Sequence, residues 1–148
     1  MTLRNLYKIG QLSTHETDLR QIRKMLMAAA RNITDAATET ISSESRLGLA
    51  YAAIIQLSMI AIWTKGYRPS KSAPGHHQTM IQSLVHSIDL GHDKILLLDT
   101  FRVRRNAMDY EGVDVDSTVS VACLDAAREL FDHVSRKINC SNRIIKSN

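Results

Sequence analysis

Cysteine is scarce in this chain, which excludes several ways of holding a small protein together. The 148 residues include two cysteines, Cys123 and Cys140, and these form no C-x-x-C pair. The disulfide framework that staples small secreted domains is therefore excluded. The N-terminal residues also lack the charged region, apolar run and cleavage site of a secretory signal. We expect a cytoplasmic protein in which Cys123 is buried and Cys140 is exposed near the C-terminus.

Aromatic residues and catalytic sequence motifs are also few. Phe, Trp and Tyr make up 5% of the chain, so its core must consist mainly of Leu, Ile, Val, Met and Ala. The sequence contains no G-x-G-x-x-G, P-loop, H-E-x-x-H or G-x-S-x-G pattern, and the enzyme classes that depend on these motifs are excluded. Its histidines lack the spacing and the carboxylate partners of a metal site. We therefore expect no metal and no cofactor.

Neither charge nor hydropathy points to a membrane. The formal net charge of +4 and the pI near 9.3 permit an anionic partner such as RNA without requiring one. The most apolar stretch, residues 47–63, is interrupted by Gln56 and Ser58 and is as short as the shortest membrane spans. We expect it to be a central helix of the core, with no membrane partner.

Apolar residues recur at helical spacing through most of the chain. The first helix is expected from about residue 14, because Ser13 and Glu16 have capping-box spacing. The predicted helices cover about residues 14–37, 43–63, 76–90, 93–110 and 117–138. No segment shows sustained alternation of period two. The sequence therefore predicts an all-α fold, an antiparallel bundle of about five helices, in one domain over residues 1–148 with its core at 14–139 and a polar tail at 140–148.

The segment 99–110 gathers the most unusual group of polar side chains. Asp99, Arg102 and Asn106 are three and four residues apart, so they share one helical face, which Asp109 flanks and Tyr110 extends by one turn. The arginines of the segment are Arg102, Arg104 and Arg105. Guanidinium groups donate two parallel hydrogen bonds to phosphate oxygens, so the segment predicts a phosphate-binding face. The alternative is a solvated face of Asp–Arg pairs.

Residues outside this segment are further candidates. His76 and His77 stand where a loop meets the next predicted helix, and a neutral imidazole there can act as a general base near pH 7. Their alternative role is capping or simple surface exposure. Arg46 and Tyr51 lie on a helix that can abut the segment 99–110. We include Arg46 among the phosphate-binding candidates; facing inwards, it would need an aspartate of that segment as its partner.

Together these residues resemble the HEPN superfamily of small helical bundles. The resemblance runs from about residue 43 to residue 137. The pieces that carry it are Arg46 with Ala50-Tyr51-Ala52-Ala53, the turn Gly66-Tyr67-Arg68-Pro69, the run Gly75-His76-His77, and Arg105-Asn106 followed by Tyr110.

In that family an arginine and a polar residue, followed four to six positions later by a histidine, form a ribonuclease motif that works without a metal across a homodimer. Arg105 and Asn106 match the first half, but the histidine positions hold Tyr110, Glu111 and Gly112. A free tyrosine has a pKa near about 10 and is a poor base at neutral pH. It can still donate a hydrogen bond to a phosphate.

The resemblance implies either a ribonuclease toxin of a toxin–antitoxin pair or a degenerate member that binds a nucleotide, RNA or a protein. Relatives of this kind are often encoded beside a nucleotidyltransferase, which is therefore the implied protein partner. We expect a homodimer that binds RNA or nucleotide phosphate in a groove lined by Arg102, Arg105, Asn106 and Tyr110. The alternatives are a non-catalytic partner subunit and a small-ligand pocket between helices.

Overall fold

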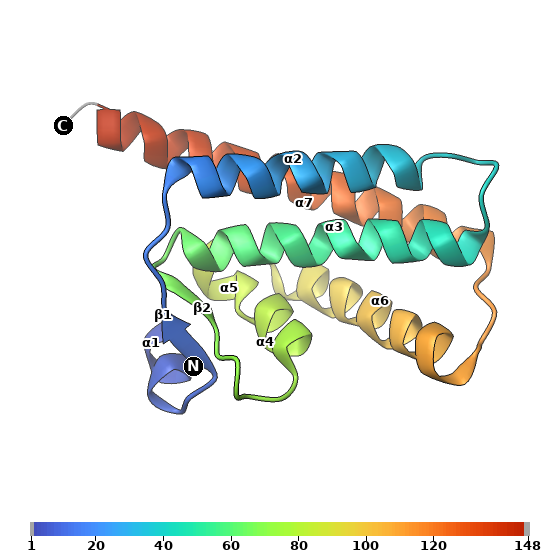
Figure 1. The fold of residues 1–148 in the computed structure, drawn as a ribbon, viewed down its shortest axis with the longest axis horizontal. Helices are drawn as coiled ribbons and strands as arrows, with labels where there is room; N and C mark the ends of the chain where they lie inside the picture. Colours follow the sequence, from blue (N-terminus) through green and yellow to red (C-terminus); the bar gives the residue numbers. More distant parts are fainter. Residues whose placement is uncertain (1, 147–148) are drawn as a thin grey trace.

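The protein is a helical bundle in which long helices pack along a central one (Figure 1). The computed structural model describes the backbone of residues 2–146 and the side chains of residues 2–139. The elements follow in the order α1 (Leu3–Lys8), β1 (Leu12–Thr14), α2 (Leu19–Ala36), α3 (Ser43–Trp63), β2 (Tyr67–Pro69), α4 (His76–Gln82), α5 (Leu84–Ser87), α6 (His92–Glu111) and α7 (Ser117–Lys146). The predicted all-α bundle is confirmed.

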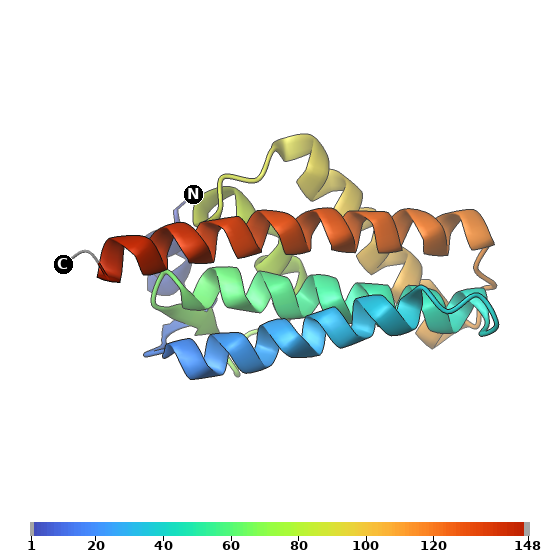
Figure 2. The same cartoon turned by 90° about the horizontal axis from the view of Figure 1, so that it is seen from above.

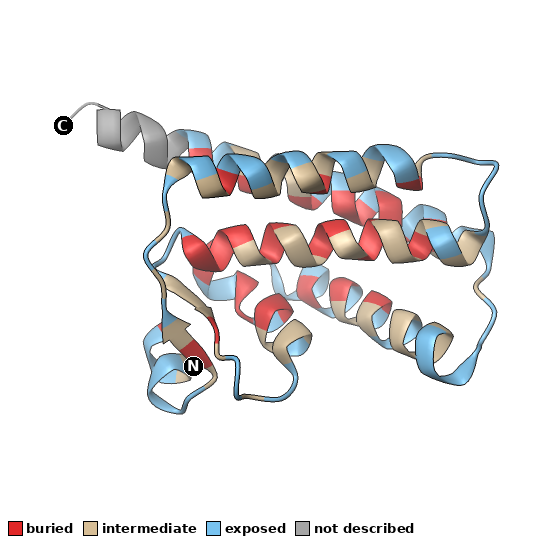
Figure 3. Ribbon diagram, viewed as in Figure 1, coloured by how far each residue is buried: buried red, intermediate tan, exposed pale blue. Residues whose placement is uncertain are grey.

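The central helix is α3, whose apolar residues lie on every face, as the sequence predicted. Its N-cap is Ser42, which accepts a hydrogen bond from the Ser45 amide. Helices α2 and α7 pack along α3, and α4, α5 and α6 cover its other side (Figures 1 and 2). Residues are buried along most of α3 (Figure 3). This burial explains why the helix tolerates almost no charge.

By length and composition alone, α3 is also the one described helix that could cross a membrane. Its most apolar window has a mean hydropathy of 1.5, and 56% of that window is buried inside the bundle. A buried core helix satisfies the same criteria, because both environments select long apolar segments.

The N-terminal region differs from the sequence prediction. The expected capping box at Ser13 is wrong, because Ser13 lies in β1 and pairs with Arg68 of β2 in a two-stranded antiparallel sheet. Helix α2 begins later, at Leu19, where the Asp18 carboxylate accepts a hydrogen bond of 2.7 Å from the Gln21 amide. Strands of three residues are too short to show an alternating pattern, so this sheet left no signal in the sequence.

The later helices differ mainly at their ends. The helix expected over 76–90 is two short helices that meet at Ser83, and the apolar residue Val85 is 40% exposed. Asp116 caps α7 by accepting a hydrogen bond of 2.8 Å from the Thr118 amide. The helix continues to Lys146, beyond the expected end near residue 138. Cys123 is buried as expected, whereas the expected exposure of Cys140 lies outside the described side chains.

Candidate phosphate-binding site

Helix α6 turns its polar residues toward α3 in its second half. Its buried residues, Ile95, Leu98 and Phe101, anchor the first part of the helix in the core. One turn after Phe101, Arg105 occupies the same inward side. Its guanidinium carbon lies 5.6 Å from the centre of the Tyr51 ring on α3. This distance is within the range of a cation–π contact, so Tyr51 holds Arg105 against the bundle.

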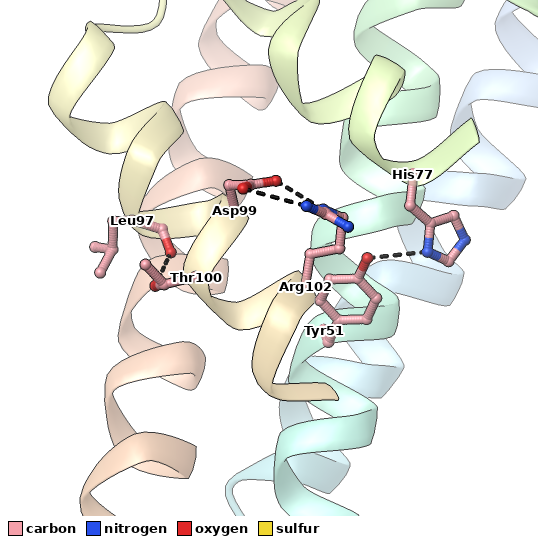
Figure 4. A network of polar contacts seen from close by, with 6 residues as sticks. All are labelled: Tyr51, His77, Leu97, Asp99, Thr100 and Arg102. Atoms are coloured by element: carbon pink, nitrogen blue, oxygen red, sulfur yellow. Dashed lines mark hydrogen bonds and ion pairs between the residues drawn. The ribbon is translucent and has the colours of Figure 1, made fainter. Parts of the chain in front are cut away.

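Tyr51 joins α6 to α4. Its side chain is 2% exposed, and its hydroxyl is 2.9 Å from Nδ1 of His77. Figure 4 shows this hydrogen bond, with the guanidinium of Arg102 lying between Asp99 and the Tyr51 ring. Three helices therefore bring a cation, a phenol and an imidazole together. The sequence indicated that Tyr51 could abut α6, but it did not include Tyr51 among the site residues.

Burial determines the protonation states of Tyr51 and His77. Burial raises the pKa of Tyr51, although the charges of Arg105 and Arg102 act in the opposite direction. Burial, followed by the charges of Arg105, His76 and Arg102, lowers the pKa of His77. Both side chains are therefore neutral near pH 7. The Tyr51 hydroxyl and Nδ1 of His77 then share one hydrogen bond, and its direction depends on which ring nitrogen of His77 carries the proton.

Two arginines of α6 are paired with aspartates of the same helix. Arg102 donates to both carboxylate oxygens of Asp99, at 2.7 and 3.3 Å. Arg105 is 2.7 Å from Asp109. The Asp–Arg pairs of the alternative interpretation are thus present. Such surface pairs contribute only about 0.3–0.5 kcal/mol, less than the roughly 1.5–3 kcal/mol of a charge-assisted hydrogen bond, so they do not prevent these arginines from binding a phosphate.

The remaining α6 candidates lie on different sides of the helix. Asn106 is half-buried and Tyr110 is 79% exposed, and both lie on the flank that carries Arg102. Arg104 is exposed and follows Arg102 by two residues, about 200° further round the helix. The structure therefore brings Arg102 and Arg105 close to Tyr51, with Asn106 beside Arg102 on the helix, whereas neither Tyr110 nor Arg104 shares the side of α6 that carries Arg105.

Arg46 also lies elsewhere. Its Nε donates a hydrogen bond of 2.8 Å to the carbonyl oxygen of Ala36, the last residue of α2. A cation is favourable there because the final carbonyl groups of a helix carry partial negative charge. Its partner is therefore a helix end, and no ion pair links it to an aspartate of α6 within the described residues.

The two candidate general bases have different surroundings. His77 contacts Tyr51 and is close enough to Arg105 and Arg102 for their charges to lower its pKa. His76 has no such contact: its Nε2 is buried and has no hydrogen-bond partner among the described residues. Those residues also contain no cluster of three or more His, Cys, Asp or Glu side chains that could hold a metal ion.

No protein-family model matches the chain, and no curated protein matches it significantly.

Proposed function

We propose that the chain is a HEPN-like protein that binds RNA, or a nucleotide phosphate, through Arg102, Arg105, Asn106 and Tyr110 of α6. The observation that supports this most strongly is the placement of Arg105 over Tyr51. A cation held in this way loses little conformational freedom when it binds an anion, which favours affinity. The Arg105 side chain is also 31% exposed, so its guanidinium is accessible to a ligand.

Cleavage of RNA makes further demands. A metal-independent ribonuclease needs one group that removes a proton from the attacking hydroxyl and one that donates a proton to the leaving oxygen. Tyr110 occupies a position where the HEPN motif has its histidine, but it is largely solvent-exposed. His77 is the imidazole that the fold joins to Arg105 through Tyr51. Under this proposal His77, in the tautomer with Nε2 unprotonated, is the candidate base.

The test compares two charge-removing variants of one helix. Arg105→Ala removes the cation over Tyr51, and Arg104→Ala removes an exposed cation on the other side of α6. We expect Arg105→Ala to weaken binding of a single-stranded RNA at least about tenfold, the effect of one lost charge-assisted contact. It should also reduce the slope of log affinity against log salt concentration by about 0.7. Arg104→Ala should leave most of the RNA affinity and most of the salt dependence intact.

The same samples are incubated with mixed RNA in the presence of a chelator. Cleavage by the parent and by Arg104→Ala, but not by Arg105→Ala, would identify a metal-independent ribonuclease. Binding without cleavage would assign the face to recognition alone. Equal binding by both variants would contradict the proposal, provided that circular dichroism shows the same helicity.

A second observation favours docking of α6 against another helix. Leu96, Val103 and Tyr110 repeat every seven residues, so they form one stripe, and their exposed fractions are 54%, 52% and 79%. We propose that this stripe is the contact of a homodimer that places two α6 faces side by side. The alternative is a non-catalytic subunit that uses the stripe to bind a nucleotidyltransferase.

Light scattering of the purified chain separates these two arrangements. A dimer that Val103→Glu converts to a monomer would support the homodimer, because a charge at the middle of the stripe must be desolvated on contact. A parent protein that is already monomeric would favour the partner-subunit role. The matched control is Val121→Glu, at an exposed apolar position on α7.

A further inference from the structure

His77 also lines a pocket of about 380 Å³. This pocket lies between the start of α2, the second half of α3, β2 and α4. Pockets that hold small ligands have volumes of about 300–1,000 Å³, so this one is large enough for a small organic molecule. Its apolar lining residues include Ile55, Met59, Trp63 and Met80.

A stacked pair of flat rings also lines the pocket. The rings of His15 and Trp63 are nearly parallel, with an interplanar angle of 27° and centroids 5.5 Å apart. His15 is also hydrogen-bonded to Gln21 at 3.2 Å, which fixes its position. A flat aromatic ligand group can stack against such a surface, and nucleobases do so without strong preference for one base.

The rim of the pocket is positive. Arg68 and Lys71 line it together with His76 and His77, and no aspartate or glutamate is among the lining residues. Within the part of the chain that the structure describes, neither Arg68 nor Lys71 forms an ion pair. Two buried nitrogens, Nε of Arg68 and Nε2 of His76, also have no hydrogen-bond partner there. Unpaired buried polar groups are rare in folded proteins and call for a partner.

From these observations we infer that the pocket is a nucleotide site, in which the base stacks on the His15–Trp63 surface and the phosphate is bound by Arg68 and Lys71. The inference concerns a second site, separate from the α6 face and independent of RNA binding there. The nucleotide can be a free mononucleotide or one residue of an RNA strand, because both present the same base and phosphate.

Trp63 makes the inference testable, because it is the one tryptophan in the sequence. Its fluorescence, excited where nucleotides do not absorb, reports directly on the pocket. The probes are AMP, adenosine, inorganic phosphate and a single-stranded RNA. We expect saturable quenching by AMP, with adenosine and phosphate at least about tenfold weaker, since each lacks one of the two contacts. Quenching by RNA but not by AMP would identify the strand as the source of the nucleotide.

Variants locate the binding. Lys71→Ala and Arg68→Gln should each weaken the AMP titration about tenfold while circular dichroism stays unchanged. Lys65→Ala, which removes an exposed cation outside the pocket, is the matched control. Arg105→Ala should also leave the AMP titration unchanged, so failure of the α6 proposal and failure of this one can be distinguished. Absence of saturable quenching by AMP and by RNA, or quenching that neither pocket variant weakens, would overturn the inference.

Discussion

Replacing Tyr51 by Phe tests the contact on which the candidate site depends. The substitution keeps the buried ring and its position beneath Arg105, and it removes only the hydroxyl that is hydrogen-bonded to His77. The net contribution of one such hydrogen bond is about 0.5–1.5 kcal/mol. His77 is only partly buried, so water can reach its Nδ1 once the hydroxyl is gone. We therefore expect a loss of about 1 kcal/mol.

This loss is measurable by urea unfolding followed by circular dichroism, or as a decrease of roughly 2–4 °C in melting temperature for a chain of this size. Tyr110→Phe is the matched control, because that side chain is 79% exposed and no hydrogen bond of its hydroxyl is found among the described residues. It should change the free energy of unfolding by less than about 0.5 kcal/mol.

A double-mutant cycle then assigns the loss to the pair. Combining Tyr51→Phe with His77→Ala should give a coupling energy of about 0.5–1.5 kcal/mol, because either substitution alone already removes the hydrogen bond. The reasoning is refuted if Tyr51→Phe is as stable as the control, or if the two substitutions are strictly additive. A loss above about 3 kcal/mol would also refute it, since a single hydroxyl does not account for so much.

Two further substitutions test other parts of the structure. Because the pKa of His77 is lowered in the folded chain, the unfolded chain binds a proton first as pH falls, and the free energy of unfolding should decrease from about pH 7.5 to 5.5. His77→Gln should reduce this dependence of stability on pH in urea titrations. An unchanged pH dependence would contradict the lowered pKa. Arg46→Ala should lower the free energy of unfolding by about 1 kcal/mol, since it leaves the Ala36 carbonyl without its partner. RNA affinity measured by fluorescence anisotropy should stay the same. Weaker RNA binding would indicate that Arg46 belongs to the phosphate site.

The parts of the fold that local sequence determines could be predicted. The apolar run of α3 lies on all helical faces, and Ser42 caps it, so both its central position and its start followed from short-range patterns. The face shared by Asp99, Arg102 and Asn106 follows from helical periodicity in the same way. The Ser13 prediction failed because a residue 55 positions away, Arg68, pairs with it in a sheet that helical spacing does not reveal.

The arrangement of the candidate site depends on contacts between distant segments. Nothing in the sequence around Arg46 indicates that it would bind the end of α2 instead of an aspartate of α6. The contact between Tyr51 and His77 likewise joins residues 26 positions apart, through packing of α4 against α3. One available signal was composition: in a chain with 5% aromatics, a tyrosine within an almost wholly apolar helix needs a partner for its hydroxyl.

Two of the few aromatic residues belong to the two proposed sites. Helix α3 carries two of the few aromatic side chains, Tyr51 and Trp63, and His77 lies between the surfaces that they form. Its Nδ1 is hydrogen-bonded to Tyr51 beneath Arg105, while its ring lines the pocket that contains Trp63. The proposed nucleotide contacts are His15, Trp63, Arg68 and Lys71, so neither proposal requires the His77 ring to move. Saturating AMP should therefore leave RNA affinity at α6 unchanged, and by linkage RNA should leave affinity for AMP unchanged.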